Sequence, residues 1–116
     1  MTPLSDVRIF LCTTPVNMSH SFDRLVRLAR ETFEQDPLSG HLFLFLNRDR
    51  DRLKILFWDR DGWSLVYKRL EAGTFQLPRT ANGTPGIELE HTQFLRLLDG
   101  LDLKTGRRRR RFRRLQ

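Results

Sequence analysis

Residues 41–68 read HLFLFLNRDRDRLKILFWDRDGWSLVYK, and this stretch decides the fold. Three apolar runs of strand length alternate with two short polar turns; the runs are 41–46, 53–58 and 63–68. Strands joined by such short connections must be antiparallel. The stretch therefore predicts an antiparallel β-meander.

The side chains of the meander divide between two faces of the predicted sheet. Along 53–58 the odd-numbered residues share one face and the even-numbered residues share the other. The same alternation recurs in 63–68. Between these two runs, the Asp61-Gly62 pair is expected to supply the positive φ of a tight hairpin.

The segment before the meander predicts a strand and a helix. Residues 7–12 (VRIFLC) form a short, partly β-branched apolar run of strand type. Residues 19–34 predict a helix, because their apolar side chains recur with 3.6-residue spacing. Those apolar side chains are Phe22, Leu25, Val26, Ala29 and Phe33. Pro37 and the Ser39-Gly40 pair are expected to end this helix.

The segment after the meander completes the predicted fold. Residues 73–78 are expected to add a short edge strand, since Pro78 cannot donate to a ladder. Residues 80–86 predict a loop, and 90–99 predict a second, shorter helix. The fold class is therefore α+β, a single domain with the first helix on one face of the sheet and the second available for the other.

The charge of the chain is concentrated at its C-terminal end. Its 116 residues include 21 Lys or Arg and 14 Asp or Glu, for a net charge of +7. Seven arginines and no acid fall within 107–116, so residues 1–106 are formally neutral. We expect a folded core over 1–106 and an arginine-rich tail that like-charge repulsion keeps disordered when unbound. No run of 18 apolar residues and no secretory signal is present, so a cytoplasmic protein without a membrane-spanning helix is expected.

The tail is the strongest signal for a binding partner. Its arginines are Arg107, Arg108, Arg109, Arg110, Arg111, Arg113 and Arg114. The planar guanidinium matches phosphate oxygens, so this run predicts phosphate-driven binding of DNA without sequence preference. Lys54, Lys68 and Arg69 on the meander are expected to extend the basic track. Most aromatic rings of the meander are expected in the core, with Trp58 and Tyr67 as exposed exceptions.

Residues suited to catalysis are scattered. The acidic residues of the two turns of the meander alternate with arginines, which favours turn hydrogen bonding over a metal site. These residues are Asp49, Asp51, Asp59 and Asp61. Cys12 and the three histidines show no metal-ligand spacing and no nucleophile motif. The sequence therefore predicts a protein that is not an enzyme, with no catalytic residues, metal or cofactor and no small-molecule substrate.

Several ordered motifs resemble one known family. They are PxSGHLFxF at 37–45, KILxWDxDG at 54–62, YKRLExGxFxxP at 67–78, PVNM at 15–18 and LLxGLD at 97–102. Together they resemble the insertion-sequence-66 accessory protein, the second open reading frame often called TnpB, which is unrelated to the RNA-guided nuclease of that name. The resemblance covers residues 7–103.

The resemblance implies an accessory protein of a bacterial mobile element, encoded beside a separate catalytic transposase. It implies no catalytic residues. Two positions depart from the family pattern: Asn17 replaces the usual Asp, and Ser19 replaces a basic residue. If the loop that carries them binds phosphate or a partner in relatives, that contact is weakened in this chain.

Three hypotheses follow for function. The first is a non-enzymatic transposition factor that binds DNA weakly through its tail. The second is an adaptor that docks on the transposase through an exposed edge at 67–78, with Tyr67, Leu70, Phe75 and Pro78 as contacts. The third and most distant is a small nuclease that would use Asp59 and Asp61.

Overall fold

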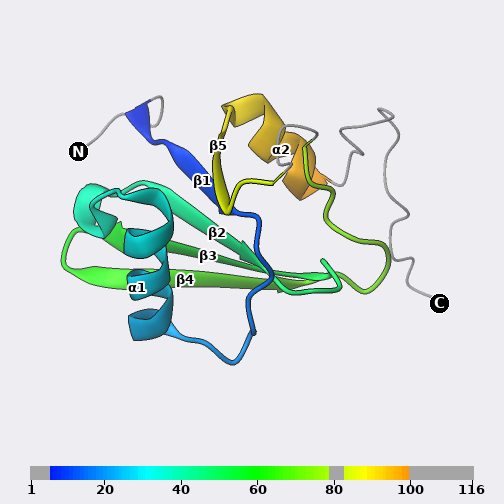
Figure 1. Ribbon diagram of the computed structural model, residues 1–116, viewed down its shortest axis with the longest axis horizontal. Coiled ribbons are helices and arrows are strands. Elements are labelled where there is room, and N and C mark those ends of the chain that lie inside the picture. Colours follow the sequence, from blue (N-terminus) through cyan, green and yellow to red (C-terminus); the bar gives the residue numbers. More distant parts are fainter. Residues whose placement is uncertain (1–5, 79–82, 100–116) are drawn as a thin grey trace.

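The computed structural model describes residues 6–78 and 83–99. Its centre is a five-stranded sheet with the strand order β4-β3-β2-β1-β5 (Figure 1). The elements in chain order are β1 (Ile9–Cys12), α1 (Phe22–Phe33), η2 (Pro37–Ser39), β2 (Leu42–Leu46), β3 (Arg52–Asp59), β4 (Gly62–Arg69), β5 (Gly86–Leu89) and α2 (His91–Asp99). The α+β class predicted from the sequence is confirmed.

The predicted meander is present as β2, β3 and β4, which pair antiparallel in sequence order. Trp58 lies opposite Trp63, and Asp59 opposite Gly62, so the β3–β4 connection is a two-residue turn. The positive φ of this turn belongs to Arg60, at 60°, and not to Gly62 as predicted. Gly62 is already part of β4, because the strand begins one residue earlier than its apolar run indicates.

The helix α1 begins at Phe22, three residues later than predicted. The segment before it forms a turn, in which Asn17 Oδ1 accepts a hydrogen bond from the Ser19 backbone N–H at 2.8 Å. Such a side-chain bond competes with helical hydrogen bonding and favours a turn. The helix ends where Glu34 adopts the left-handed conformation and donates its N–H to the Arg30 carbonyl.

The strands β1 and β5 make the sheet mixed. β1 runs parallel to β2, with Ile9 opposite Leu42, and antiparallel to β5, with Ile9 also opposite Leu89. The sequence does not predict β5 (Gly86–Leu89), because its pattern indicates a loop over 80–86 and a helix from residue 90. Its apolar signal, GIEL, spans only four residues beside a Pro- and Gly-containing segment.

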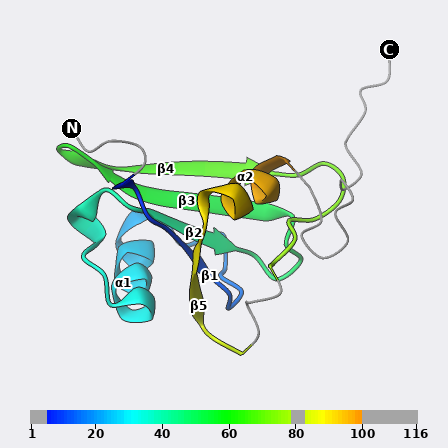
Figure 2. The same cartoon turned by 90° about the horizontal axis from the view of Figure 1, so that it is seen from above.

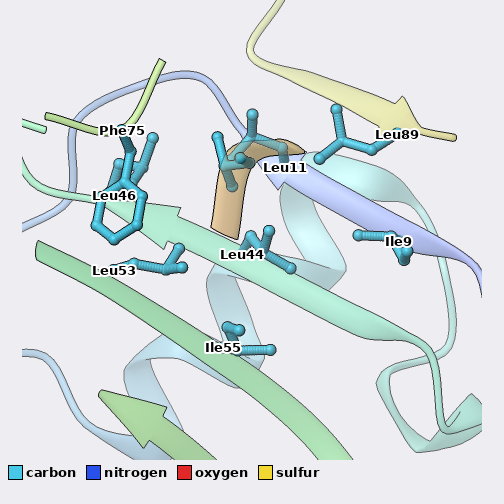
Figure 3. Packing of buried hydrophobic residues seen from close by; sticks show 9 residues of the cluster. Ile9, Leu11, Leu44, Leu46, Leu53, Ile55, Phe75 and Leu89 are labelled. Atoms are coloured by element: carbon cyan, nitrogen blue, oxygen red, sulfur yellow. The ribbon is translucent and has the colours of Figure 1, made fainter. Parts of the chain in front are cut away.

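Each face of the sheet is covered by one helix, as the sequence suggested. On the α1 face, Phe10, Phe43 and Phe45 are buried together with Leu25 of the helix. On the α2 face the buried side chains are mostly aliphatic (Figure 3). They are Ile9, Leu11, Leu44, Leu46, Leu53, Ile55, Phe75, Leu89 and Leu97.

The predicted edge strand at 73–78 is wrong. This segment has no strand and instead crosses to the β2–β3 turn, where the Phe75 N–H donates to the Arg50 carbonyl at 2.7 Å. The Phe75 ring is fully buried in the α2 face. Burial of this ring therefore outweighs the pairing that its sequence pattern indicated.

A helix that crosses a bilayer needs about 20 consecutive, mostly apolar residues. Within residues 6–78 and 83–99, no helix is long and apolar enough to cross a membrane.

Candidate nucleic-acid interface

The turn between β2 and β3 presents arginines from a fixed backbone. Asn47 Oδ1 accepts hydrogen bonds from the backbone N–H groups of Asp51 and Arg52, both at 3.0 Å. Its Nδ2 donates to the Asp51 carboxylate at 2.6 Å. Arg48 and Arg50 are exposed on this turn. Asp51 thus serves the turn, as the sequence predicted for the acidic residues of the meander.

The C-terminal end of β4 adds two further cations beside this turn. The β3–β4 register places Lys68 opposite Leu53 and Arg69 opposite Arg52. Like charges directly opposite one another destabilise an antiparallel pair. The cost is reduced because each guanidinium has another partner: Arg52 Nη1 donates to the Tyr67 hydroxyl at 3.3 Å, and Arg69 Nη2 lies 2.8 Å from Glu71 Oε1. The hydrogen bond to Tyr67 raises the pKa of Arg52 further.

These cations lie at one end of the sheet, which we call the basic end; Arg52 and Arg69 are on the α1 face, whereas Lys68, opposite the buried Leu53, is on the α2 face. Its members are Arg48, Arg50, Arg52, Lys68 and Arg69. Of the acidic groups around them, Glu71 is paired with Arg69, Asp51 accepts a hydrogen bond from the neutral Asn47 amide, and Asp49 is exposed on the same turn. A cleft of about 590 Å³ lies beside the basic end, between residues 15–18 and the β2–β3 turn. The loop that carries the two departures from the family pattern, Asn17 and Ser19, therefore borders the basic end.

Lys54 does not belong to this surface, in contrast to the prediction from sequence. Only 6% of the residue is exposed. Its ammonium donates to the carbonyls of Met18 and His20, at 2.6 and 2.7 Å, and lies 4.8 Å from the centre of the Tyr67 ring. Lys54 holds the loop before α1 against the sheet, and this use of its donors removes it from the candidate phosphate contacts.

The predicted partner-binding residues are mostly inaccessible. Phe75 and Pro78 are buried, and Leu70 packs against the α2 face. Tyr67 alone keeps about half of its surface exposed, at 49%. Trp58 is half-buried and makes an edge-to-face contact with Trp63. The surface predicted over 67–78 is therefore reduced to the strand β4 itself.

The seven tail arginines, from Arg107 to Arg114, lie outside the described residues. The direction of α2, the last described element, is known. The α2 residue His91 contacts the Val7 carbonyl at the start of β1. From there α2 runs toward the end of the sheet that carries the β2–β3 turn (Figures 1 and 2). The last described helix thus ends on the side of the basic end.

The arrangement of acidic residues is unsuited to two-metal chemistry. Asp49 and Asp51 precede β3, whereas Asp59 and Asp61 follow at its other end. Asp51 and Asp59 are eight positions apart along the strand, which separates the two pairs by about 26 Å, far more than the roughly 4 Å between paired metals. Within the described part of the chain, no three His, Cys, Asp or Glu side chains gather to hold a metal. Burial raises the pKa of the Cys12 thiol, which disfavours a reactive thiolate.

The sequence predicted Lys68 and Arg69 as basic contacts but not Arg48, Arg50 and Arg52. Those arginines alternate with aspartates, a pattern that predicts a solvated turn. The register of β3 and β4 is what brings them beside Lys68 and Arg69. A sequence signal did exist, because a β-meander places its first turn next to the end of its third strand.

Comparison with known proteins gives a family and similar chains. The family model described as IS66 Orf2 like protein matches residues 7–108. Two similar chains are the uncharacterized proteins y4jC and y4hO of Sinorhizobium fredii (strain NBRC 101917 / NGR234). The first is 33% identical over 100 residues, which cover 86% of this chain and 84% of y4jC. The second is 33% identical over 97 residues, which cover 84% of this chain and 83% of y4hO. No solved structure matches the chain.

Proposed function

The chain belongs to the IS66 Orf2-like protein family, which makes it a transposition-associated accessory protein, and we propose that in this role it binds duplex DNA. Binding is directed at phosphates and is independent of base sequence. The chain contributes no catalytic group, and it acts in the bacterial cytoplasm where the element's DNA lies. The reaction chemistry belongs to a separate transposase.

The observation that carries this proposal is that Arg48 and Arg50 are exposed on a turn whose backbone Asn47 holds, with Lys68 exposed at the adjacent end of β4. Phosphate suits this position, since guanidinium groups form paired hydrogen bonds with its oxygens.

The members of the basic end contribute unequally. Arg48, Arg50 and Lys68 form no ion pair within the described residues and are exposed. Arg69 is already neutralised by Glu71. We therefore assign the main phosphate contacts of the folded core to Arg48, Arg50 and Lys68, with Arg52 held behind them by Tyr67.

The tail joins this surface in the proposal. The helix α2, which ends at Asp99, runs toward the basic end, and Arg107 follows Asp99 by eight residues in the sequence. An extended chain of eight residues spans up to about 28 Å. The tail arginines can therefore reach the same stretch of duplex as the basic end and add phosphate contacts to it.

The test is a salt series of DNA binding, measured by fluorescence anisotropy with a labelled duplex. Each phosphate contact adds about 0.9 to the steepness of log K against log salt. Removal of residues 107–116, with seven arginines, is expected to reduce the steepness by up to about 6. The triple variant Arg48→Gln, Arg50→Gln and Lys68→Gln is expected to reduce it by about 2 to 3.

A matched control removes three cations from another face. Arg24, Arg27 and Arg30 are exposed on α1, and their triple replacement by Gln changes the net charge equally. This control is expected to leave the steepness almost unchanged. Equal effects of the two triple variants would show a diffuse charge effect and contradict an interface at the basic end. A tailless chain that binds like the full chain would remove the tail from the mechanism.

A further inference from the structure

The strand β4 forms an open edge of the sheet. It lies at one end of the strand order and is eight residues long (Figure 2). Its last four residues are all exposed, including the apolar Val66 and Tyr67, each at 49%. Proteins usually shorten, bend or cover such an edge, because its unpaired backbone groups attract another strand.

The direction of the free backbone groups follows from the hairpin. A two-residue turn makes Asp59 and Gly62 a hydrogen-bonded pair, and such pairs alternate with non-hydrogen-bonded ones along an antiparallel ladder. The even-numbered residues of β4 therefore direct their backbone groups toward β3. The odd-numbered residues, from 63 to 69, direct theirs outward from the sheet.

The charges of β4 are arranged so that the strand complements itself. Asp61 precedes its first residue, and Lys68 and Arg69 form its last two. When two such strands run antiparallel, the acidic start of each lies beside the basic end of the other. We propose that β4 pairs with β4 of a second copy of this chain, joining two sheets into one continuous sheet across a two-fold axis.

One register satisfies both the backbone and the side chains. Outward backbone groups require odd-numbered residues to face odd-numbered residues. A two-fold axis at Leu65 does this, and it places Trp63 opposite Tyr67 and Asp61 opposite Arg69 of the second copy. All three positions share the α1 face, so they form an aromatic pair and an ion pair on each side of the axis.

The neighbouring registers are poorer. A shift by two residues in one direction brings Asp61 opposite Glu71, which places like charges together. The opposite shift brings Asp61 opposite Tyr67 and would need Asp59 to meet Arg69. Asp59, however, belongs to β3, so it cannot continue the pairing of β4. The central register is therefore the one that pairs the whole strand.

The helices leave room for this contact. α1 packs on β1, β3 and β5, and α2 packs on β5, the strand at the opposite edge of the sheet from β4. The inference shares only Arg69 with the basic end, where Arg69 is paired with Glu71 and is not assigned a main phosphate contact. Its other contacts are the backbone of β4, Asp61 and the aromatic pair, so dimerisation and DNA binding can be tested separately.

The test is a charge swap measured by sedimentation equilibrium of the full chain, freed of nucleic acid, over a concentration series. The wild-type chain is expected to form dimers. Asp61→Arg alone, or Arg69→Asp alone, introduces two like-charge contacts per dimer and is expected to raise the dimer dissociation constant about 10- to 100-fold. The double variant Asp61→Arg, Arg69→Asp restores opposite charges and is expected to return the constant close to the wild-type value.

Recovery of dimerisation in the double variant distinguishes an ion pair between two chains from an effect within one chain. Residues 61 and 69 lie about 26 Å apart along a single strand, too far for contact. Asp49→Arg, which makes the same charge change in the exposed β2–β3 turn, is the matched control and should leave dimerisation unchanged. A monomeric wild-type chain, a double variant that stays monomeric, or an equal effect of Asp49→Arg would each overturn the proposal. Circular dichroism of every variant checks that it is folded.

Discussion

The two edges of the sheet differ in how much of the molecule is built onto them. β5 is four residues long and continues almost at once into α2. It begins at Gly86, which lies so close to α1 that an added Cβ would be 2.4 Å from Phe33 Cε1. β4 is twice as long, and the side chains that reach it, from Arg52 and Lys54, come from the neighbouring strand.

The β5 edge is therefore held by other elements of the fold, whereas the β4 edge is available to partners. At β5, contacts with α1 and α2 hold a strand of only four residues. At β4, the backbone edge and the nearby cations stay exposed, and both proposed interactions use this side of the sheet. Variants on the β5 side are therefore expected to change stability. On the β4 side, the exposed residues 66–69 should change stability little, whereas Lys54, which holds the loop before α1, should change it strongly.

The largest effect is expected from Lys54→Met, which tests whether this lysine is structural. The two carbonyls that accept from its ammonium, those of Met18 and His20, would lose their partner. An unsatisfied buried acceptor costs about 1 to 3 kcal/mol, and water can relieve part of that cost. We expect the free energy of unfolding, measured by chemical denaturation, to fall by about 2 to 4 kcal/mol.

The matched control for this variant is Lys68→Met, which changes an exposed lysine of the adjacent strand. Its effect on unfolding should stay within about 0.5 kcal/mol, as is usual for surface positions. In DNA binding the order of the two effects should be reversed. Lys68→Met should weaken binding, because Lys68 belongs to the proposed interface, whereas Lys54→Met should leave binding unchanged. A Lys54→Met chain as stable as Lys68→Met would show that the loop does not depend on this ammonium.

A smaller loss is expected from Gly86→Ala at the closed edge. The new methyl group would collide with the Phe33 ring and with Thr32 Cγ2, which lies 2.9 Å from the ideal Cβ position. Overpacking of this kind costs about 1 to 3 kcal/mol, measured as lost free energy of unfolding. Gly62→Ala at the start of β4 meets nothing within 4 Å and is the control. Similar losses at the two glycines would mean that the edges are equally constrained.

The parts of this architecture that sequence predicts well are those with long periodic patterns. The α1 helix and the three strands of the meander each carry several turns or alternations of apolar residues, and each was placed within about three residues. The division of the sheet into two covered faces also followed from the alternation in 53–58. In these regions local pattern and tertiary packing favour the same structure.

The missed features depend on contacts between distant segments. β5 is held by pairing with β1, about 77 positions earlier in the chain, and its own four-residue pattern is too short to predict. Phe75 looks like a strand residue but is buried by the turn that it meets. Lys54 looks like a surface cation until the loop before α1 folds over it. The basic end needed the β3–β4 register, which no single segment contains.

The smallest effect is expected from Glu88→Gln, which tests the ion pair that joins β5 to β1. The Glu88 carboxylate lies 2.5 Å from Arg8 Nη2 and 3.0 Å from its Nε. This pair lowers the pKa of Glu88 below the ordinary 4.5. Both side chains are almost half exposed, so water and salt screen the interaction and the loss should be smaller than that of Gly86→Ala.

The loss of unfolding free energy in Glu88→Gln is expected to depend on pH. A carboxyl group with a lowered pKa in the folded chain adds stability that is complete above its unfolded pKa and disappears as the pH falls through the folded value. The difference in unfolding free energy between wild type and Glu88→Gln should therefore be present at neutral pH and shrink below about pH 4.5. Glu90→Gln, at an exposed carboxylate without an ion pair in the described residues, is the control. A difference that persists unchanged into acid would show that Glu88 acts through packing at the β5 edge and not through its charge.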